Sequence, residues 1–264
     1  MEKEEYIRYK DINLHLTVLE ADKSAPCVIF IPGAGCYAEL YSDFLWTLHL
    51  EGLNVLGLTL QGHGKSAGKR GQFSYGDVIS NVKAAAKYAL ENYNDKIGIC
   101  GSSLGGILSL YMSIEIEEIK CAVCHNVIDL KDLPFGSPSF DGLNMEYIPL
   151  QFLFDWNKIF DEQANLDKLR SDELMVWEYT VDTVISLFAE KENKPNIEEA
   201  TKATMVLVSG GDKILPPDVC KKVYDKMSCK KKYLSIPSVG HMLFIEHIDE
   251  VIDEVGYWFK ENLC

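Results

Sequence analysis

Lys96-Ile-Gly-Ile-Cys-Gly-Ser-Ser-Leu-Gly-Gly-Ile107 is the stretch of this chain that decides the fold. It begins with the apolar run Ile97 to Cys100, which is typical of a short strand buried on both faces. The pattern breaks at Gly101 and resumes at Leu104 with the spacing of a helix. The five residues in between, Gly-Ser-Ser-Leu-Gly, match G-x-S-x-G with Ser103 at the centre.

The spacing of this motif has a physical reason. A serine on a sharp strand-to-helix turn has strained backbone angles, and glycines two positions before and after it let neighbouring backbone pass without a Cβ clash. The next helix directs its N-terminus at the serine, where free N–H groups stabilise an oxyanion. The alternative is a Gly/Ser-rich loop, but the predicted strand before Ser103 and the helix after it favour a nucleophile.

The composition is that of a globular chain with a large core: 264 residues, of which 47% are hydrophobic and 25% charged. The net charge of −14 (26 basic minus 40 acidic residues) argues against nucleic acid or an anionic membrane as a partner, because both need Lys/Arg clusters. No apolar stretch approaches the roughly 18 residues of a membrane span, and the charged N-terminus is unlike a signal peptide.

The eight cysteines are scattered, and several lie inside predicted strands, as expected of reduced, buried thiols. This usage predicts a cytoplasmic protein rather than a disulfide framework. Cys121-x-x-Cys124 lies within the strand-like run 119–127, and no second Cys/His pair stands at zinc spacing, so a structural role is favoured over a metal site.

The rest of the chain alternates between predicted strands and helices. Residues 5–20 read as a β-hairpin that turns at Lys10-Asp11. Between 129 and 202 strand signals vanish, and aromatic-rich amphipathic segments take their place. Further strands are predicted at 27–31, 54–60, 119–127, 203–208 and 231–236, and helices at 38–50, from the cap Ser74 to about 93, 217–227 and 246–262.

This alternation predicts an α/β fold, a doubly wound and mostly parallel sheet opened by an antiparallel hairpin. We expect the core at 1–128 and 203–264, with a helical cap inserted at 129–202. The working residues of such sheets lie at the carboxyl ends of the strands. At those ends the sequence has Pro32-Gly-Ala-Gly35, Gly62-His-Gly-Lys-Ser66, Ser103, Gly210-Gly-Asp212 and Gly240-His241.

With Gly33-Ala34-Gly35, Gly62-His-Gly-Lys-Ser66 and G-x-S-x-G each following a strand, the chain resembles the α/β-hydrolase superfamily. Within it, residues 25–130 and 200–262 look like the serine hydrolases grouped with monoacylglycerol lipases and lysophospholipases. Asp212, with Pro216 following, and His241 complete the order Ser, Asp, His that the family implies. Where lipases often have His-Gly in the first loop, this chain has Pro32-Gly33, which keeps the amide donors.

The resemblance implies a role for each of these residues. Ser103 is expected to attack an acyl carbonyl, His241 to take its proton, and Asp212 to hold the imidazole. The oxyanion is expected to receive N–H groups from Leu104 and Ala34. No metal cluster or dinucleotide fingerprint stands in the sequence, so no cofactor is expected.

Other residues compete for these roles. His63 precedes Ser103 in the chain, against the order of the superfamily, so we interpret it as an architectural histidine of its glycine-rich turn. The remaining candidates are interpreted as structural: His125 as a core histidine, Cys36 as a packing residue, His247 as a residue of the final helix, and Asp218 and Asp225 as residues of the preceding helix.

The predicted cap is rich in Phe, Trp, Leu and Met, which suits an apolar roof over Ser103, although the same side chains are also expected if they only pack the cap onto the core. It has few basic residues, Lys158 and Arg170 among them, which favours a small neutral substrate. We expect a short or medium acyl ester, or by resemblance a monoacylglycerol.

Three alternatives stay open at this point. Thioesters and peptides are cleaved by the same three groups. An aminopeptidase would need a carboxylate for the free amine of its substrate, for which Glu146, Asp155 and Asp161 are candidates. A non-catalytic binder of the same fold is the third alternative, because a fold does not by itself imply an activity.

Overall fold

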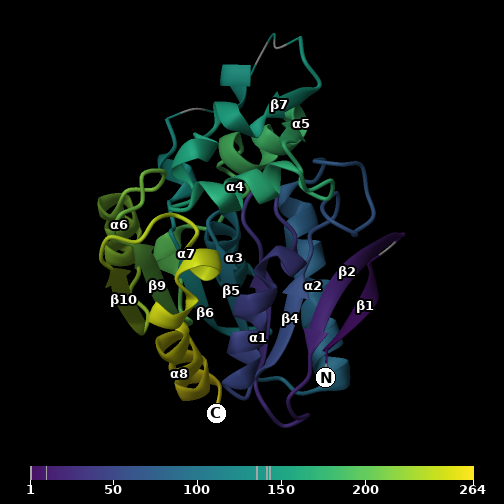
Figure 1. Cartoon of the computed structure of the whole chain (residues 1–264), viewed down its shortest axis with the longest axis vertical. Coiled ribbons are helices and arrows are strands. Elements are labelled where there is room, and N and C mark those ends of the chain that lie inside the picture. The colour runs from purple at the N-terminus through teal and green to yellow at the C-terminus, as the bar shows by residue number, and fades with distance from the viewer. Residues whose placement is uncertain (1, 10, 135, 141, 143) are drawn as a thin grey trace.

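A central β-sheet positions the other elements of the chain (Figure 1). The computed structural model describes residues 2–9, 11–134, 136–140, 142 and 144–264, and within these ranges the sheet has eight strands in the order β1-β2-β4-β3-β5-β6-β9-β10. These strands are β1 (Glu2–Tyr9), β2 (Ile12–Leu19), β3 (Cys27–Ile31), β4 (Asn54–Leu58), β5 (Ile97–Ser102), β6 (Ile119–His125), β9 (Ala203–Ser209) and β10 (Lys231–Ile236).

The antiparallel strand pairs lie at one edge of this sheet. β1 pairs with β2, and β2 with β4, in antiparallel register, whereas the strands from β4 to β10 run parallel. The predicted hairpin is confirmed, with Tyr9 opposite Ile12, while Lys10 at its predicted turn lies outside the described residues. The mostly parallel α/β sheet with an N-terminal hairpin is therefore as predicted.

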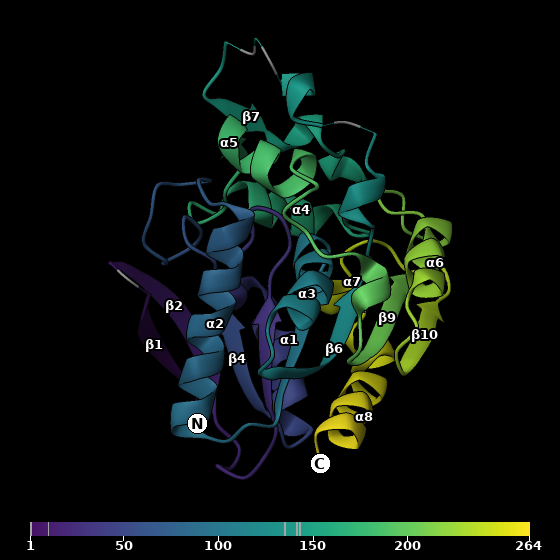
Figure 2. The ribbon, with the colours of Figure 1, turned by 180° about the vertical axis from the view of Figure 1, so that it is seen from behind.

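Helices cover both faces of the sheet. α1 (Ser42–Leu50) and α8 (Ile252–Leu263) lie on the face turned to the viewer in Figure 1, and α2 (Tyr75–Asn92), α3 (Leu104–Glu115) and α6 (Pro217–Lys226) lie on the face seen in Figure 2. Ser74 caps α2 as predicted, because its Oγ accepts the Asp77 N–H at 3.1 Å. None of the helices in the described ranges is long and apolar enough to cross a membrane.

Two predicted helices differ from the structure at their starts. The helix predicted at 38–50 begins as the 3₁₀ turn Ala38–Tyr41 before α1. The helix predicted at 246–262 is wrong in its first turns: α7 (Leu243–Glu246) is followed by a 3₁₀ turn, Ile248–Glu250, and then by α8. His247 breaks the helix with φ −139° and therefore does not lie on the final helix. The side chains of Glu246 and His247 bind another segment instead, as described below.

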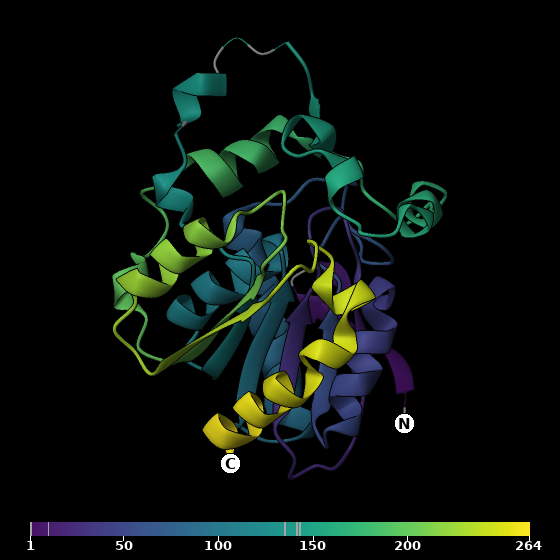
Figure 3. The same cartoon turned by 60° about the vertical axis from the view of Figure 1, so that its left-hand side comes forward.

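Residues 129–202, here called the cap segment, lie above the carboxyl ends of the strands (Figures 1 and 3). The segment contains α4 (Gln163–Arg170), α5 (Val181–Val184) and a π-helical turn at Ile185–Ala189. The expectation that it lacks strands is wrong, because β7 (Tyr147–Pro149) and β8 (Glu178–Thr180) form an antiparallel pair. Strands of three residues are too short to give a period of two in the sequence. The division into a core and a cap domain stays a prediction.

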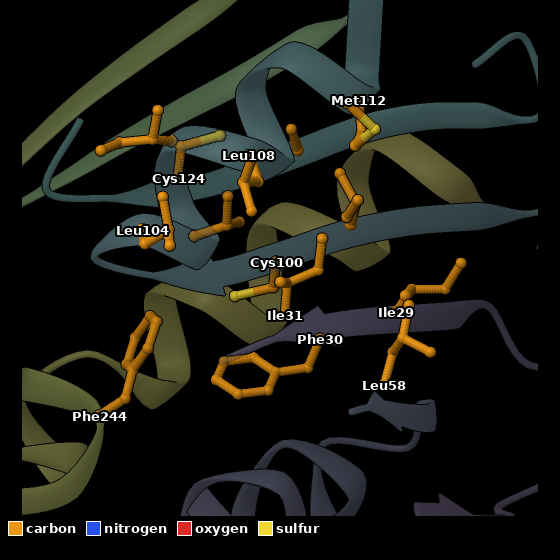
Figure 4. Close-up of a cluster of buried hydrophobic side chains, with 14 of the residues drawn as sticks. Ile29, Phe30, Ile31, Leu58, Cys100, Leu104, Leu108, Met112, Cys124 and Phe244 are labelled. Atoms are coloured by element: carbon orange, nitrogen blue, oxygen red, sulfur yellow. The ribbon is translucent and has the colours of Figure 1, made fainter. Parts of the chain in front are cut away.

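Buried side chains pack tightly on both sides of the central strands (Figure 4). Leu108 and Met112 of α3 lie on one side, and Phe30 of β3 and Phe244 of α7 on the other. The ring of Phe44 stacks on that of Phe244 with centroids 4.0 Å apart. β3 and β5 are buried along their whole length, which is why they read as continuous apolar runs.

The turn from β5 into α3 depends on close backbone contacts. Ser103 has φ 54° and ψ −120°, a conformation that is strained for any residue with a side chain. A Cβ on Gly105 would lie 2.0 Å from the Ile31 carbonyl oxygen, and one on Gly101 would lie 2.2 Å from the Gly105 oxygen. Only glycine lets β3, β5 and α3 approach one another this closely.

Replacing Gly105 by alanine is therefore expected to destabilise the fold. The added methyl group must displace backbone rather than a flexible side chain, so Gly105→Ala should lower the free energy of unfolding by about 2 kcal/mol or more. Gly76→Ala is the matched control, because its Cβ would meet Ser74 Oγ at an ordinary 3.7 Å on the exposed start of α2. It should stabilise the protein by up to about 1 kcal/mol. Urea unfolding measures both, and equal effects of the two changes would contradict this account.

Candidate active site

Three of the sequence-predicted residues are joined by hydrogen bonds at the carboxyl ends of the strands. Ser103 Oγ lies 2.7 Å from His241 Nε2, and His241 Nδ1 lies 2.7 Å from Asp212 Oδ2. His241 and Asp212 are buried, with 2% and 7% of their surface exposed. With Nδ1 donating to the carboxylate, Nε2 of a neutral His241 can accept the Ser103 hydroxyl hydrogen. The arrangement can take a proton from Ser103 when its oxygen attacks an electrophile.

Asp212 is held as a carboxylate by several donors. Burial alone would raise its pKa, but the hydrogen bond and positive field from His241 and the amides of Ile214 and Leu215 outweigh this, so the pKa of Asp212 lies below its usual value. Those amides donate to Asp212 Oδ1 at 2.6 and 3.0 Å. The carboxylate is therefore ionised and fixed in orientation near neutral pH.

Asn126 is a further residue of this site that the sequence analysis missed. Its Nδ2 donates to Asp212 Oδ2 at 2.5 Å, and its Oδ1 accepts the Ser209 N–H at 3.0 Å. Asn126 has φ 53°, a conformation that asparagine tolerates better than most residues. It stands just past β6, the strand next to β9, so its place at a strand end was the available signal.

The loop after β3 runs beside Ser103. A Cβ on Gly33 would lie 3.6 Å from Ser103 Cβ. The Gly33 N–H donates to Tyr41 Oη at 3.3 Å and the Gly35 N–H to Tyr179 Oη at 2.8 Å. Among the hydrogen bonds of the described residues, none is donated by the amides of Ala34 or Leu104. The expectation that these two amides bind an oxyanion stays a prediction.

Tyr179 links this loop to the cap segment and to His63. Its hydroxyl accepts from Gly35 and contacts His63 Nε2 at 3.1 Å, while His63 Nδ1 lies 3.0 Å from the Gln61 carbonyl. His63 makes no contact with Ser103 within the described hydrogen bonds. Its predicted architectural role agrees with this geometry. Tyr179 was missed, because nothing in its local sequence links it to a loop far away in the chain.

The side chains of the other competing residues make no hydrogen bond to Ser103, Asp212 or His241 among the described hydrogen bonds. His125 bridges Ser102 Oγ and Ser209 Oγ at 3.3 and 3.0 Å beneath the site. Cys36 lines the site, but burial raises the pKa of its thiol to about 12, so it is no thiolate. Asp218 and Asp225 lie on α6, and Cys121 and Cys124 are buried in β6.

The cap segment is bound to the loop that carries His241. Asp161 Oδ2 accepts the Gly240 N–H at 2.7 Å and lies 2.9 Å from His247 Nε2. Glu246 accepts the backbone N–H groups of Asp161 and Glu162 at 2.8 and 3.0 Å, just before α4 begins. A carboxylate at a helix N-terminus is a favourable arrangement. These bonds fix one end of the cap segment to the residues flanking His241.

A small chamber lies at Ser103. Its volume is about 30 Å³, and its polar reacting groups are Ser103 and His241. The remaining lining residues come from the core loops and from the cap segment: Gly33, Ala34, Cys36, Tyr41, Phe154, Trp156, Ile159, Ile214 and Met242. The chamber is thus apolar apart from the reacting groups and one tyrosine hydroxyl, as small-molecule sites commonly are.

Known proteins were then compared with this fold and site. The family model described as "Serine aminopeptidase, S33" matches residues 22–248. The chain belongs to this family. This S33-family chain is similar to the 2-hydroxy-6-oxo-6-(2'-aminophenyl)hexa-2,4-dienoic acid hydrolase of Metapseudomonas resinovorans, with 25% identity over 247 residues. The match covers 88% of this chain and 83% of that hydrolase.

Two solved structures share the fold of the S33-family chain. A monoacylglycerol lipase from Paleococcus ferrophilus superimposes with a TM-score of 0.78 at 18% identity, covering 94% of this chain and 99% of that one. A soluble variant of the Saccharomyces cerevisiae monoglyceride lipase, in complex with a substrate analog, gives 0.78 at 14% identity, covering 100% and 96%. The resemblance inferred from the sequence is confirmed, and the chain is a hydrolase of the α/β class.

The buried His63 predicts a specific dependence of stability on pH. Burial lowers the pKa of His63 from 6.5 to about 4, so the unfolded chain binds a proton that the folded chain does not. Stability is therefore lost as the pH falls below the unfolded pKa of 6.5 toward the folded value. Between about pH 7 and about pH 5 this one group should cost about 2 kcal/mol.

His63→Gln removes the titrating group and keeps a polar side chain. Urea unfolding of both proteins at the two pH values measures this. The unfolding free energy of the wild type minus that of the variant should be about 2 kcal/mol smaller at pH 5 than at pH 7. His125 is present in both proteins and cancels from the comparison. A constant difference would mean that His63 is not held neutral in the folded chain.

Proposed function

We propose that this chain is a serine hydrolase that cleaves a neutral carboxylic ester, either a short or medium acyl ester or a monoacylglycerol-like one, through an acyl-enzyme. The observation that carries the proposal is the continuous hydrogen-bonded series from Asp212 through His241 to Ser103, with 2.7 Å at each step. Nucleophile, base and orienting carboxylate at hydrogen-bond distance are the arrangement that acyl transfer through serine needs.

The mechanism follows from these groups. Ser103 Oγ forms a bond to the acyl carbon while His241 Nε2 takes the hydroxyl proton, and Asp212 stabilises the resulting imidazolium. The carbonyl oxygen becomes an oxyanion that accepts the N–H groups of Ala34 and Leu104. His241 then gives its proton to the departing alcohol. Water then attacks the acyl carbon of the acyl-enzyme while His241 takes its proton. The bond between Ser103 and the acyl group breaks, Ser103 regains its proton from His241, and the acid is released.

The lining of the chamber supports a neutral ester. Apart from His241, the residues that line it within the described part of the chain carry no charged side chain. A phosphate or carboxylate beside the reacting carbonyl would therefore lose its hydration without gaining a partner, which is costly. Phe154 and Ile159 from the cap segment instead offer an apolar contact to an acyl or alkyl group.

The rival activity is that of an aminopeptidase, which the family description names. It needs a carboxylate near Ser103 for the free amine, and the candidates have other partners. Glu146 pairs with Lys69, Asp155 lies 3.5 Å from Lys158, and Asp161 accepts from Gly240. None of the three is among the described residues that line the chamber. A panel of para-nitrophenyl butyrate, an acyl thioester and leucine para-nitroanilide separates the activities, and we expect the ester to react fastest.

We also propose a cytoplasmic location. All eight cysteines are free thiols, and burial raises the pKa of several of them, Cys100 and Cys124 among them. Free thiols in this number suit a reducing compartment.

Ser103→Ala tests the proposal directly. Without the nucleophile, kcat for para-nitrophenyl butyrate should fall by about 10⁶-fold, and Asp212→Asn should lower it by about 10⁴-fold because the imidazole loses its orientation and charge partner. Ser80→Ala is the control, because that serine lies on α2, is not among the described residues that line the chamber, and donates to the Gly76 carbonyl. Ser103→Ala protein that retains wild-type turnover while folded would overturn the proposal.

A further inference from the structure

The chamber at Ser103 is much smaller than an ordinary ligand site. Its volume of about 30 Å³ leaves room for only a few water molecules. Pockets that hold small-molecule ligands measure about 300 to 1,000 Å³. If Ser103 is the nucleophile proposed above, most of its substrate must lie outside this chamber.

A larger groove lies on the cap segment and shares one residue with this chamber. The groove, here called the outer groove, has a volume of about 590 Å³. Trp156 lines both it and the chamber. The other residues of the outer groove are Pro149, Gln151, Phe152, Asp155, Asn157, Arg170, Trp177 and Glu178.

A single stretch of chain, residues 154–157, contributes residues to both spaces and is here called the wall. Phe154 lines the chamber and Asp155 and Asn157 line the outer groove, so successive residues of this stretch face opposite spaces. Trp156 stands between them, with 9% of its surface exposed. Its ring meets those of Phe154 and Trp177 edge to face, with centroids 4.8 and 4.7 Å apart.

The wall is short and is anchored at both ends. On one side the Leu150 N–H donates to the Trp177 carbonyl at 2.9 Å. On the other, Asp161 is bound to Gly240 and Glu246, as described above. Between these anchors lies the 3₁₀ turn Trp156–Lys158, a single turn of poor hydrogen-bond geometry. Rotation of the Trp156 ring within this stretch would join the two spaces without disturbing either anchor.

We infer that the outer groove binds the non-reacting arm of the ester, an uncharged arm that carries an aromatic ring, and that the Trp156 ring is the part of the wall that moves to connect it to Ser103. This inference rests on the proposed function and adds to it a substrate class and a residue that selects for it. The reacting carbonyl would occupy the enlarged chamber, and the ring-bearing arm would extend past Trp156 into the outer groove.

The chemistry of the groove favours such an arm. Three rings, those of Phe152, Trp156 and Trp177, line it, and aromatic rings bind one another by offset or edge-to-face contacts. Phe152 is 70% exposed, so a large apolar surface is available to a ligand. Two of the three charged groups of the groove, Arg170 and Asp155, also have partners within the protein, whereas Glu178 is exposed to solvent and has no ion-pair partner among the described residues.

Arg170 Nη2 donates to Asn157 Oδ1 at 3.1 Å, and its Nη1 lies 3.4 Å from Asp167 Oδ1. Asp155 Oδ1 accepts the Asn157 N–H at 3.1 Å. A charged arm would have to compete with these contacts or pair with the solvent-exposed Glu178, which gains little free energy, whereas an uncharged ring needs neither.

Three esters and two variants test this inference. Methyl acetate has no ring, naphthyl acetate has a ring on the alcohol side, and methyl naphthylpropanoate has one on the acyl side. The quantity compared is the ring-to-methyl ratio, which is kcat/KM for a ring-bearing ester divided by kcat/KM for methyl acetate. For the ester whose ring occupies the outer groove, Phe152→Ala should lower this ratio by about fivefold, because it removes one aromatic contact. Trp46→Ala is the control, because that exposed tryptophan lies on α1, and it should leave all three values unchanged.

Trp156→Ala should raise the same ratio by about threefold, because the passage between the chamber and the outer groove would stay open. Trp156→Phe should move the ratio in the same direction and guards against misfolding of the alanine variant. Calorimetric titration of Ser103→Ala protein with naphthyl acetate supplies a readout without turnover, and adding Phe152→Ala should weaken that binding.

Ring-to-methyl ratios that Phe152→Ala leaves unchanged for both ring-bearing esters would overturn the inference, and so would ratios that Trp156→Ala and Trp156→Phe fail to raise. The proposed function would survive either result as long as hydrolysis depends on Ser103. Hydrolysis that persists in Ser103→Ala protein would instead remove the proposed function, so the two failures are distinguishable.

Discussion

The strained backbone of Ser103 is the constraint on which the rest of this structure depends. A serine at φ 54° costs about 1 to 3 kcal/mol relative to a relaxed conformation, and the surrounding contacts must enforce it. They do so because Gly101 and Gly105 let β3, β5 and α3 meet backbone to backbone. This turn lifts the Ser103 hydroxyl out of the end of β5, a strand that is fully buried, and directs it toward His241.

The remaining parts of the site are fixed by contacts between distant segments. Asn126 holds Asp212, Tyr179 holds the loop after β3, and Glu246 and Asp161 bind the cap segment to the residues around His241. The cap segment therefore does two things at once. It orders the loops of the site from above, and its residues Phe154 and Trp156 line the chamber at Ser103.

Much of the fold could be predicted from the sequence because its signals are local. The strand, the turn and the helix around Ser103 lie within a dozen residues, and the order Ser, Asp, His follows from strand ends that a parallel sheet brings to one edge. Tyr179 could not be predicted, since its partner Gly35 lies 144 residues away and no strand end or motif marks its position. Asn126 was missed although it stands just past the end of β6, because its role depends on the partner Asp212 on a different strand end. The short strands β7 and β8 and the break at His247 likewise depend on contacts with the rest of the chain.

Labelling with a small fluorophosphonate, followed by mass spectrometry of the modified peptide, tests most directly whether Ser103 is an activated nucleophile, because such a probe reacts with a serine only when its hydroxyl is activated. We expect one adduct, on Ser103, which His241→Ala abolishes while the protein stays folded. An unmodified Ser103 in folded wild-type protein would contradict this expectation, as would an adduct that forms equally well without His241.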